Sequence, residues 1–352
     1  MLPVTTAIHF KFYIVNLKQL FFTTPVVWSE GLPSLDQRQP MLLMGSCFAS
    51  EMGVRLQCAK FDVDLNPFGV LYNPLSIAEA LSEIMDGRRY TTGDLFCHEG
   101  LWHSWMHHSD FSAAEAEEVV THINARLQQA HHRLTKLQRV VLTLGSAYVY
   151  RLTASGEVVG NCHKMPERNF HRERLTVEEV TEALTAVIER LLALNPELKI
   201  LLTVSPIRHL RDGLHANQLS KSTLLLATDA LCRRFPQQLF YLPIYEVMMD
   251  ELRDYRYYAD DLVHPSSLAL EYIWNTLIDK CFTAEAKVVM QECEAISKAL
   301  AHRPLHPDSE AYKRFLEQTL LKIERLNGKF PNLDLQNEHA ICHTLLNKLR
   351  NR

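Results

Sequence analysis

Arg139-Val-Val-Leu-Thr-Leu-Gly145 is an almost entirely apolar run that ends at a glycine. Apolar side chains at successive positions, without alternation, predict a strand that is buried on both faces, as in a parallel sheet. Residues 40–44, 199–206 and 238–243 are similar short runs. We therefore expect these four segments to be strands of one sheet.

Segments with apolar residues at helical spacing lie between and after these runs. The expected helices cover residues 48–56, 113–137, 175–194, 217–234 and 266–281. Strands that alternate with helices of this length favour right-handed βαβ units. The sequence thus predicts an α/β fold with a doubly wound parallel sheet.

The chain of 352 residues is longer than a single core usually accommodates, so we expect an appendage to the sheet domain. Residues 22–282 are assigned to the α/β domain. Residues from 283 onward carry helical signals and no strand signal, which predicts a helical C-terminal extension. Residues 1–21 are interpreted as a poorly specified N-terminal extension.

Composition and charge argue against several classes of protein. The formal net charge is −4, without the basic excess of a nucleic-acid-binding protein. The eight cysteines are spread singly, without a Cys-x-x-Cys pair, which is typical of reduced thiols in the cytoplasm. Charged residues interrupt the apolar patches of the first twenty residues, so we expect neither a signal peptide nor a membrane partner.

The first candidate motif is Met44-Gly-Ser-Cys-Phe-Ala-Ser50, which follows the first strand and opens a helix. In a doubly wound sheet, chemistry gathers at the loops that follow the C-terminal ends of the strands. The free N–H groups and the dipole of a helix N-terminus stabilise a thiolate or an oxyanion. Cys47 or Ser46 is then a nucleophile; the alternative is a Ser46 helix cap beside a small buried Cys47.

The second candidate motif pairs Asp261 with His264, three residues apart, just before the last helix of the domain. In a turn, this spacing lets the carboxylate accept a hydrogen bond from one imidazole nitrogen while the other nitrogen faces a nucleophile. The alternative is an aspartate that caps a turn beside a surface histidine.

The third candidate motif is Gly145-Ser146-Ala147, at the end of the 139–145 strand, where backbone N–H groups can form an oxyanion hole. The polar segment 160–164 follows it. Asn161 and His163 in this segment either serve the site or belong to an ordinary loop.

Two further pairs of residues have alternative interpretations. Arg208 and His209 follow the 199–206 strand, where they either bind an anionic part of a substrate or, for the arginine, pair with nearby carboxylates. His103 and His107 have the spacing of metal ligands on a helix, but no Glu-x-x-His motif accompanies them. No nucleotide-binding signature is present, so we expect neither a metal nor another cofactor.

Gly45-Ser-Cys-Phe-Ala49 resembles the signature after which the GSCFA-domain family is named. Further segments resemble blocks of the same family in the same order, at residues 66–74, 144–150, 161–164, 203–213 and 261–266. The family is similar to the SGNH, or GDSL-like, hydrolases, which include esterases, lipases, carbohydrate deacetylases and some acyltransferases.

The resemblance implies a flavodoxin-like three-layer α/β/α sandwich, with His264 as general base and Asp261 as the acid that orients it. SGNH enzymes usually have Gly-Asp-Ser-hydrophobic after the first strand. Aligning the hydrophobic residue with Phe48 places Cys47 at the nucleophile position, whereas aligning the serines selects Ser46. We favour Cys47, because the helix then begins in register and a thiolate paired with a histidine is a competent nucleophile.

The chain departs from the SGNH pattern at the oxyanion hole. The third SGNH block is usually Gly-x-Asn, whereas this chain has Ala147 at the third position. We expect Gly69 to supply a backbone N–H to the oxyanion hole. We expect Asn66 or Asn161 to replace the missing side-chain amide, close to the backbone of Ser146. Loss of one such donor raises the barrier of a comparable enzyme by about 3 kcal/mol.

The resulting hypothesis is an enzyme that acts by nucleophilic acyl transfer on an ester or acyl substrate, such as an O-acetylated carbohydrate. If water accepts the acyl group the enzyme is a hydrolase, and if a sugar hydroxyl accepts it the enzyme is an acyltransferase. The alternative is a catalytically weak domain that binds a carbohydrate or an acylated ligand. Neither the oligomeric state nor a pathway follows from the sequence.

Overall fold

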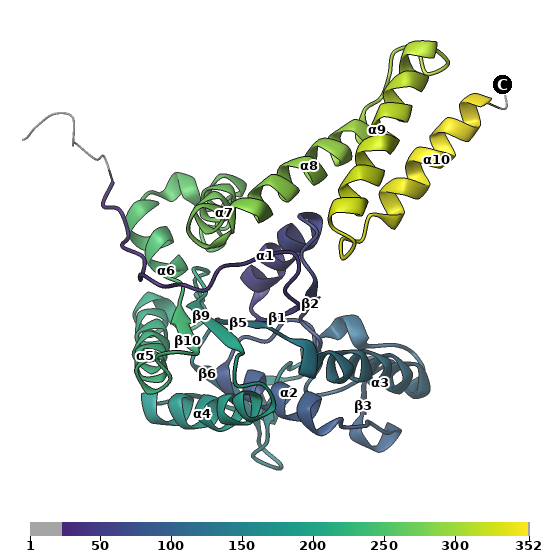
Figure 1. The fold of residues 1–352 in the computed structure, drawn as a ribbon. Helices are drawn as coiled ribbons and strands as arrows, with labels where there is room; N and C mark the ends of the chain where they lie inside the picture. Colours follow the sequence, from purple (N-terminus) through teal and green to yellow (C-terminus); the bar gives the residue numbers. More distant parts are fainter. Residues whose placement is uncertain (1–22, 351–352) are drawn as a thin grey trace, which may run out of the picture.

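The structure, a computed structural model, describes residues 23–350, so the expected extension over residues 1–21 lies outside the described residues. A five-stranded sheet forms its centre (Figure 1). The strands are β1 (Met41–Gly45), β2 (Val63–Leu65), β5 (Arg139–Leu144), β9 (Lys199–Val204) and β10 (Leu239–Tyr241). All four pairings between neighbouring strands are parallel, which confirms the predicted sheet.

The order of the strands locates the functional edge of the sheet. Across the sheet the order is β2-β1-β5-β9-β10, which becomes 2-1-3-4-5 when these five strands are counted along the chain. This is the flavodoxin-like order, in which the chain reverses direction across the sheet between the first and third strands. Ligands bind at such a switch point, outside the carboxyl ends of the strands. Here the two strands are β1 and β5, which end at Gly45 and Leu144.

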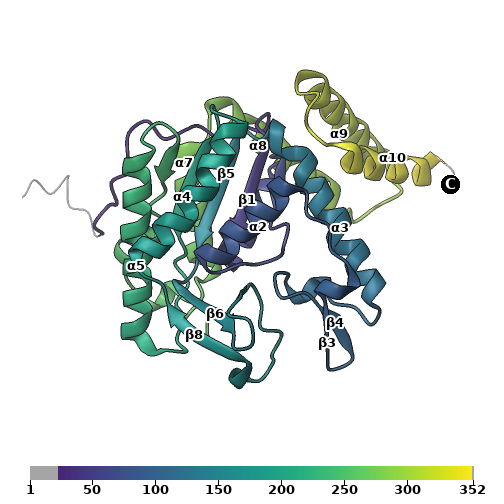
Figure 2. The same cartoon turned by 90° about the horizontal axis from the view of Figure 1, so that it is seen from below.

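Helices cover both faces of the sheet, and Figure 2 shows one of these layers from below. Side chains of α2 (Pro74–Asp86), α3 (Ala116–Arg133), α4 (Val177–Leu194) and α5 (Gly213–Arg234) share one core. The opposite core contains side chains of α1 (Cys47–Cys58) and α7 (Ser267–Cys281). Alternate residues of β1 enter the two cores, which explains why its run is apolar at every position. The expected three-layer α/β fold is therefore present.

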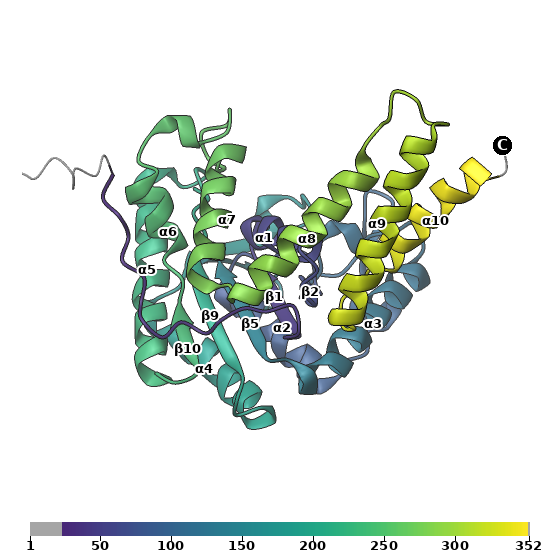
Figure 3. The same ribbon diagram turned by 45° about the horizontal axis from the view of Figure 1, so that its top comes forward.

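The C-terminal residues form a helical arm, as expected. Its helices are α8 (Ala284–Ala301), α9 (Glu310–Lys329) and α10 (Gln336–Arg350), and Figure 3 shows α9 and α10 side by side. Side chains of all three helices form an apolar core separate from the two cores of the sheet. The arm contacts the main domain through an ion pair between Lys60 and Glu338, with nitrogen and oxygen 2.7 Å apart.

The structure contains further elements that the sequence did not predict, because they lack a long apolar run. Helix α2 follows Asn73, whose side chain caps it by accepting from the amide of Ser76, with Pro74 as its first residue. Two small antiparallel sheets lie outside the central one. They consist of β3 (Phe96–His98) with β4 (Leu101–His103), and of β6 (Tyr148–Leu152) with β7 (Val158–Val159) and β8 (Phe170–Arg174).

His107 is a core side chain in a turn after β4, so it does not share a helix face with His103. Its ring is fully buried and stacks on Phe68 with the ring centroids 4.4 Å apart. The Nδ1 atom is 2.9 Å from the Ser104 hydroxyl. Burial lowers the pKa of His107 to about 3, so the ring is neutral in the folded state.

We expect His107 to make folding sensitive to acid. The unfolded chain takes up a proton near the ordinary histidine pKa of about 6.5, whereas the folded chain does not, so stability present above that pH is lost as the pH falls. Between about pH 7.5 and about pH 5 this loss amounts to about 2 kcal/mol. Urea unfolding at both pH values should show that His107→Phe loses about 2 kcal/mol less than the wild type.

The control for this experiment is His215→Phe, at an exposed position. It should retain the full acid sensitivity of the wild type. An equal loss of stability in the His107 and His215 variants would contradict the assignment of His107 as a buried neutral side chain.

Candidate active site

Gly45 makes the turn from β1 into α1. Its φ angle is +142°, and a Cβ atom at this position would overlap the carbonyl oxygen of Thr143 on β5. The Gly45 N–H donates to Asn66 Oδ1 at 2.9 Å, and the Asn66 amide donates to the Ser50 hydroxyl at 2.9 Å. Glycine is required here because the two strands approach closely just where the chain changes direction.

Cys47 is the first residue of α1 and is partly exposed. Its Sγ atom lies 4.0 Å from Nε2 of His264, which is 217 residues away along the chain. Burial raises the pKa of the Cys47 thiol, whereas the amides of Cys47 and Phe48 and the hydroxyl of Tyr72 act in the opposite direction. The helix N-terminus thus offers the N–H groups that the sequence interpretation assigned to it.

Asp261 orients the imidazole of His264. The Asp261 Oδ2 atom is 2.6 Å from Nδ1 of His264, while Oδ1 accepts from the amides of Val263 and His264 at 2.9 and 3.0 Å. These hydrogen bonds, led by the His264 amide, lower the pKa of Asp261 to about 2. An ionised acceptor at Nδ1 selects the tautomer with a proton there, which leaves Nε2 as a base toward Cys47.

Ser46 occupies a different environment from Cys47. The residue is only 1% exposed, and its hydroxyl has no hydrogen-bond partner within the described residues. It stands at the N-cap of α1 without making a side-chain cap. Of the two candidate nucleophiles, the structure brings Cys47 against His264.

Tyr72 is a residue of the site that the sequence interpretation missed. Its hydroxyl acts to lower the pKa of the Cys47 thiol, and burial raises the Tyr72 pKa to about 12, so the hydroxyl keeps its proton at neutral pH. Its carbonyl oxygen accepts from the amides of Gly145 and Ser146 at 2.8 and 2.9 Å. The signal available in the sequence was its place in the 66–74 block, directly before the Asn-Pro that begins α2.

Gly69 and Asn66 do not present free donors to Cys47 in this structure. The Gly69 N–H donates to the Asn66 carbonyl at 2.8 Å, in a turn where Gly69 has a φ angle of +76°. The side chain of Asn66 is engaged with the Gly45 turn, as described above. The Gly69 N–H closes the turn after β2 by this hydrogen bond. It is therefore not free to act as the oxyanion donor that the sequence led us to expect.

Ser146, Asn161 and His163 also have structural partners. The Ser146 hydroxyl accepts from the amide of Tyr148 at 3.0 Å, and the Asn161 side chain accepts from the amide of His163 at 2.8 Å. The His163 ring is buried, with Nε2 2.8 Å from the Ser104 carbonyl. These contacts support the ordinary-loop interpretation of residues 160–164 over a role in the oxyanion hole.

His209 and Arg208, in the segment that follows β9, contact different aromatic residues. The His209 ring is 5.8 Å from the ring of Tyr72, and burial, followed by the charge of Lys221, lowers its pKa to about 4. The Arg208 guanidinium lies 4.6 Å above the ring of Tyr258. This stacking takes the place of the carboxylate pairing that was the alternative for Arg208.

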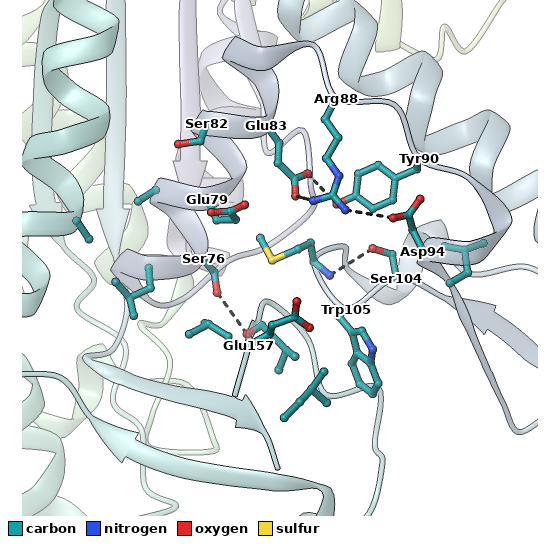
Figure 4. A pocket seen from close by; sticks show the side chains of 18 of the residues that line it. Ser76, Glu79, Ser82, Glu83, Arg88, Tyr90, Asp94, Ser104, Trp105 and Glu157 are labelled. Carbon is teal, nitrogen blue, oxygen red and sulfur yellow. Dashed lines mark hydrogen bonds and ion pairs between the residues drawn. The ribbon is translucent and has the colours of Figure 1, made fainter. Parts of the chain in front are cut away.

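A cavity of about 760 Å³ lies beside α2, away from this constellation (Figure 4). Its lining includes Glu83, whose carboxylate pairs with Arg88 at 2.5 Å and accepts from the Tyr90 hydroxyl at 2.7 Å. Neither Cys47 nor His264 lines it. The cavity is therefore separate from the candidate active site.

Two whole-molecule surveys complete the description. Among residues 23–350 there is no cluster of three or more His, Cys, Asp or Glu side chains that could hold a metal ion. In the same part of the chain, no helix combines the length and the apolar character needed to span a membrane.

These features define an α/β protein with a Cys-His-Asp constellation at the switch point of a flavodoxin-like sheet. The chain belongs to the GSCFA family, whose model matches residues 40–277. A second model, described as the C-terminal domain of GSCFA domain proteins, matches residues 293–348 in the helical arm. No curated protein matches the chain.

We expect Gly45→Ala to destabilise the protein by more than about 2 kcal/mol, because the methyl group overlaps a strand carbonyl and the backbone angle is unfavourable for L-residues. The matched control is Gly328→Ala, inside α9, where nothing lies within 4 Å of the added methyl group. This control should be neutral or stabilise the protein by up to about 1 kcal/mol. Thermal unfolding of both variants is the measurement, and a tolerated Gly45→Ala would contradict the close approach.

Proposed function

We propose that the chain is a cysteine-dependent, SGNH-like hydrolase or acyltransferase. The observation that carries the proposal is the alignment of Cys47 Sγ, the His264 imidazole and the Asp261 carboxylate, with separations of 4.0 and 2.6 Å. This alignment lies at a helix N-terminus and at the switch point of the sheet. A relation to the SGNH hydrolases agrees with the strand order and with the late Asp-x-x-His.

The proposed reaction begins when Nε2 of His264 removes the proton from the Cys47 thiol. The sulfur attacks the acyl carbonyl carbon, the carbon–oxygen double bond opens to an oxyanion, and His264 returns the proton to the leaving alcohol as its bond to carbon breaks. Water or a hydroxyl group then attacks the thioester carbonyl carbon and gives its proton to His264. The carbon–sulfur bond breaks as the carbonyl re-forms, the acid or the new ester leaves, and His264 returns the proton to the sulfur. The separation of 4.0 Å shortens when substrate binds, as is common for catalytic hydrogen bonds.

We assign three donors to the region where the oxyanion would form. Two are the amides of Cys47 and Phe48, which already act on the Cys47 sulfur. The third is the Tyr72 hydroxyl, which we assign to the position left open by Ala147. A neutral hydroxyl held beside the sulfur can donate to the developing charge without being deprotonated by it.

The substrate class that we propose is an ester or O-acyl group, with an O-acetylated carbohydrate as one example. All eight cysteines are free, which agrees with a protein of the reducing cytoplasm. One observation favours the alternative of a catalytically weak, ligand-binding domain, namely that burial raises the pKa of the Cys47 thiol. A test for a covalent acyl adduct on the protein distinguishes the enzyme from the ligand-binding domain.

Activated esters such as p-nitrophenyl acetate should leave an acyl group on the wild-type protein and on Ser46→Ala, but not on Cys47→Ala. Intact-mass measurement after a short incubation detects the adduct, and peptide mapping places it. Cys58→Ala, which removes an exposed thiol, is the matched control for non-specific acylation. A specific adduct that persists in Cys47→Ala and disappears in Ser46→Ala would show that the serine is the nucleophile.

Tyr72→Phe should lower kcat for a responsive ester by about 10²-fold, with a smaller change in KM, because it removes a donor used in the transition state. Steady-state kinetics are the measurement. The control is Tyr255→Phe, since Tyr255 is 65% exposed and outside the contacts of Cys47. Equal kcat values for the two variants would exclude Tyr72 from the oxyanion hole.

A further inference from the structure

A small pocket, which we call the Arg208 pocket, has a volume of about 150 Å³. Arg208 and Tyr258 line it, together with apolar side chains that include Met248, Met249 and Leu252. Cavities of about 150 Å³ hold one benzene ring, whereas complete small-molecule sites measure about 300–1,000 Å³. The Arg208 pocket therefore suits one group of a larger substrate rather than a whole molecule.

The Arg208 pocket borders the segment that carries His264. The amide of Arg208 donates to the Val263 carbonyl at 3.3 Å, and the backbone of Tyr258 forms a β-bridge with Pro265. Val263 and Pro265 are the residues on either side of His264 in the chain. Two residues that line the pocket thus also hold the segment that presents the proposed base.

Arg208 contributes a positive charge to the pocket. Its side chain is half-buried, and among residues 23–350 no carboxylate forms an ion pair with it. Asp254 lines the same pocket, but its two oxygens are engaged by Arg256, through the amide at 2.9 Å and the guanidinium at 3.1 Å. A second arginine, Arg253, also lines the pocket and is exposed. The pocket therefore presents positive charge to a ligand.

The orientation of the Arg208 guanidinium favours an anionic ligand. The group lies 4.6 Å above the ring of Tyr258, which is buried and therefore a fixed support. Stacking uses the face of a guanidinium and leaves the N–H donors at its edge available. These donors form a planar fork that matches the oxygens of a carboxylate or a phosphate.

The apolar wall of the pocket belongs to a rare local structure. Met248 and Met249 lie in a π-helical turn, Val247–Glu251. Such turns occur frequently at functional sites. Methionine side chains are flexible and polarizable, so they adapt to the shape of an apolar group. The pocket thus combines an adaptable apolar wall with an arginine that has no acidic partner among the described residues.

We propose that the Arg208 pocket binds an anionic group of the substrate, a carboxylate or a phosphate carried on an apolar part of about ring size. The guanidinium pairs with the anion, and the methionine wall covers the part that carries it. This assignment of a substrate class rests on the proposed function. Binding of a small anion in the pocket does not, because it can be measured without turnover.

Isothermal titration calorimetry measures the binding of benzoate and phenyl phosphate, with benzamide as the neutral counterpart of benzoate. The experiment compares Arg208→Met, which removes the charge and the donor fork, with Arg208→Lys, which keeps the charge alone. Arg233→Met, which alters an exposed arginine of α5, is the matched control. Thermal unfolding of each variant checks that it is folded.

The wild type should bind benzoate or phenyl phosphate at least about tenfold more tightly than benzamide, because only the anions form charge-assisted hydrogen bonds with the guanidinium. The tighter of the two anions identifies the group on the substrate. The preference should be lost in Arg208→Met, partly retained in Arg208→Lys and unchanged in Arg233→Met. A wild type without this preference, or a preference that survives in Arg208→Met, would overturn the proposal.

Steady-state kinetics connect the pocket with turnover. The substrates are 4-acetoxybenzoate, or 4-acetoxyphenyl phosphate if phosphate binds more tightly, and the neutral methyl 4-acetoxybenzoate. Arg208→Met should raise KM for the anionic ester about tenfold and leave KM for the neutral ester unchanged. An equal change for both esters would reduce Arg208 to a support of the His264 segment. If anions bind through Arg208 while the wild type turns over neither ester, the Arg208 pocket stands and the proposed acyl transfer fails.

Discussion

The close approach of β1 to β5 at Gly45 is the constraint on which the site depends. The Gly45 backbone lies so near the Thr143 carbonyl that no side chain fits between the two strands. The chain therefore leaves the sheet at this point and enters α1 with Cys47 as the first helical residue. The position of the sulfur is decided by main-chain packing between two buried strands, which gives the proposed nucleophile a rigid base.

The partners of Cys47 come from segments that the sheet topology brings together. Tyr72 lies directly before the N-cap of α2, and His264 lies shortly before α7. Each segment is anchored to a strand end or to the loop beside it, as when the Tyr72 carbonyl accepts from the amides of Gly145 and Ser146. The switch point collects these groups because neighbouring connections leave it on opposite faces of the sheet.

Much of the fold was predictable because its strands are continuous apolar runs, and such runs report burial on both faces directly. The strands β6 to β8 were not predicted, because they are only partly buried and contain polar residues such as Arg151. The elbow at Cys47 and the Asp261–His264 pair could be proposed from local spacing. We expected the Gly69 N–H to be free, whereas it donates to Asn66 in the structure. A sequence motif identifies a residue but does not show the hydrogen-bond partner of its N–H.

Tyr72 was not predictable for a related reason, since only tertiary contacts give a tyrosine before a helix cap its place in the site. The exposure of the other two side chains bears on what the site can do. The Asp261 and His264 side chains are both 49% exposed, so water screens the charge of this pair. The pair can orient a ring and move a proton, but it offers little electrostatic support to a thiolate. That support must come from the amides of Cys47 and Phe48 at the start of α1, which act to lower the pKa of the thiol.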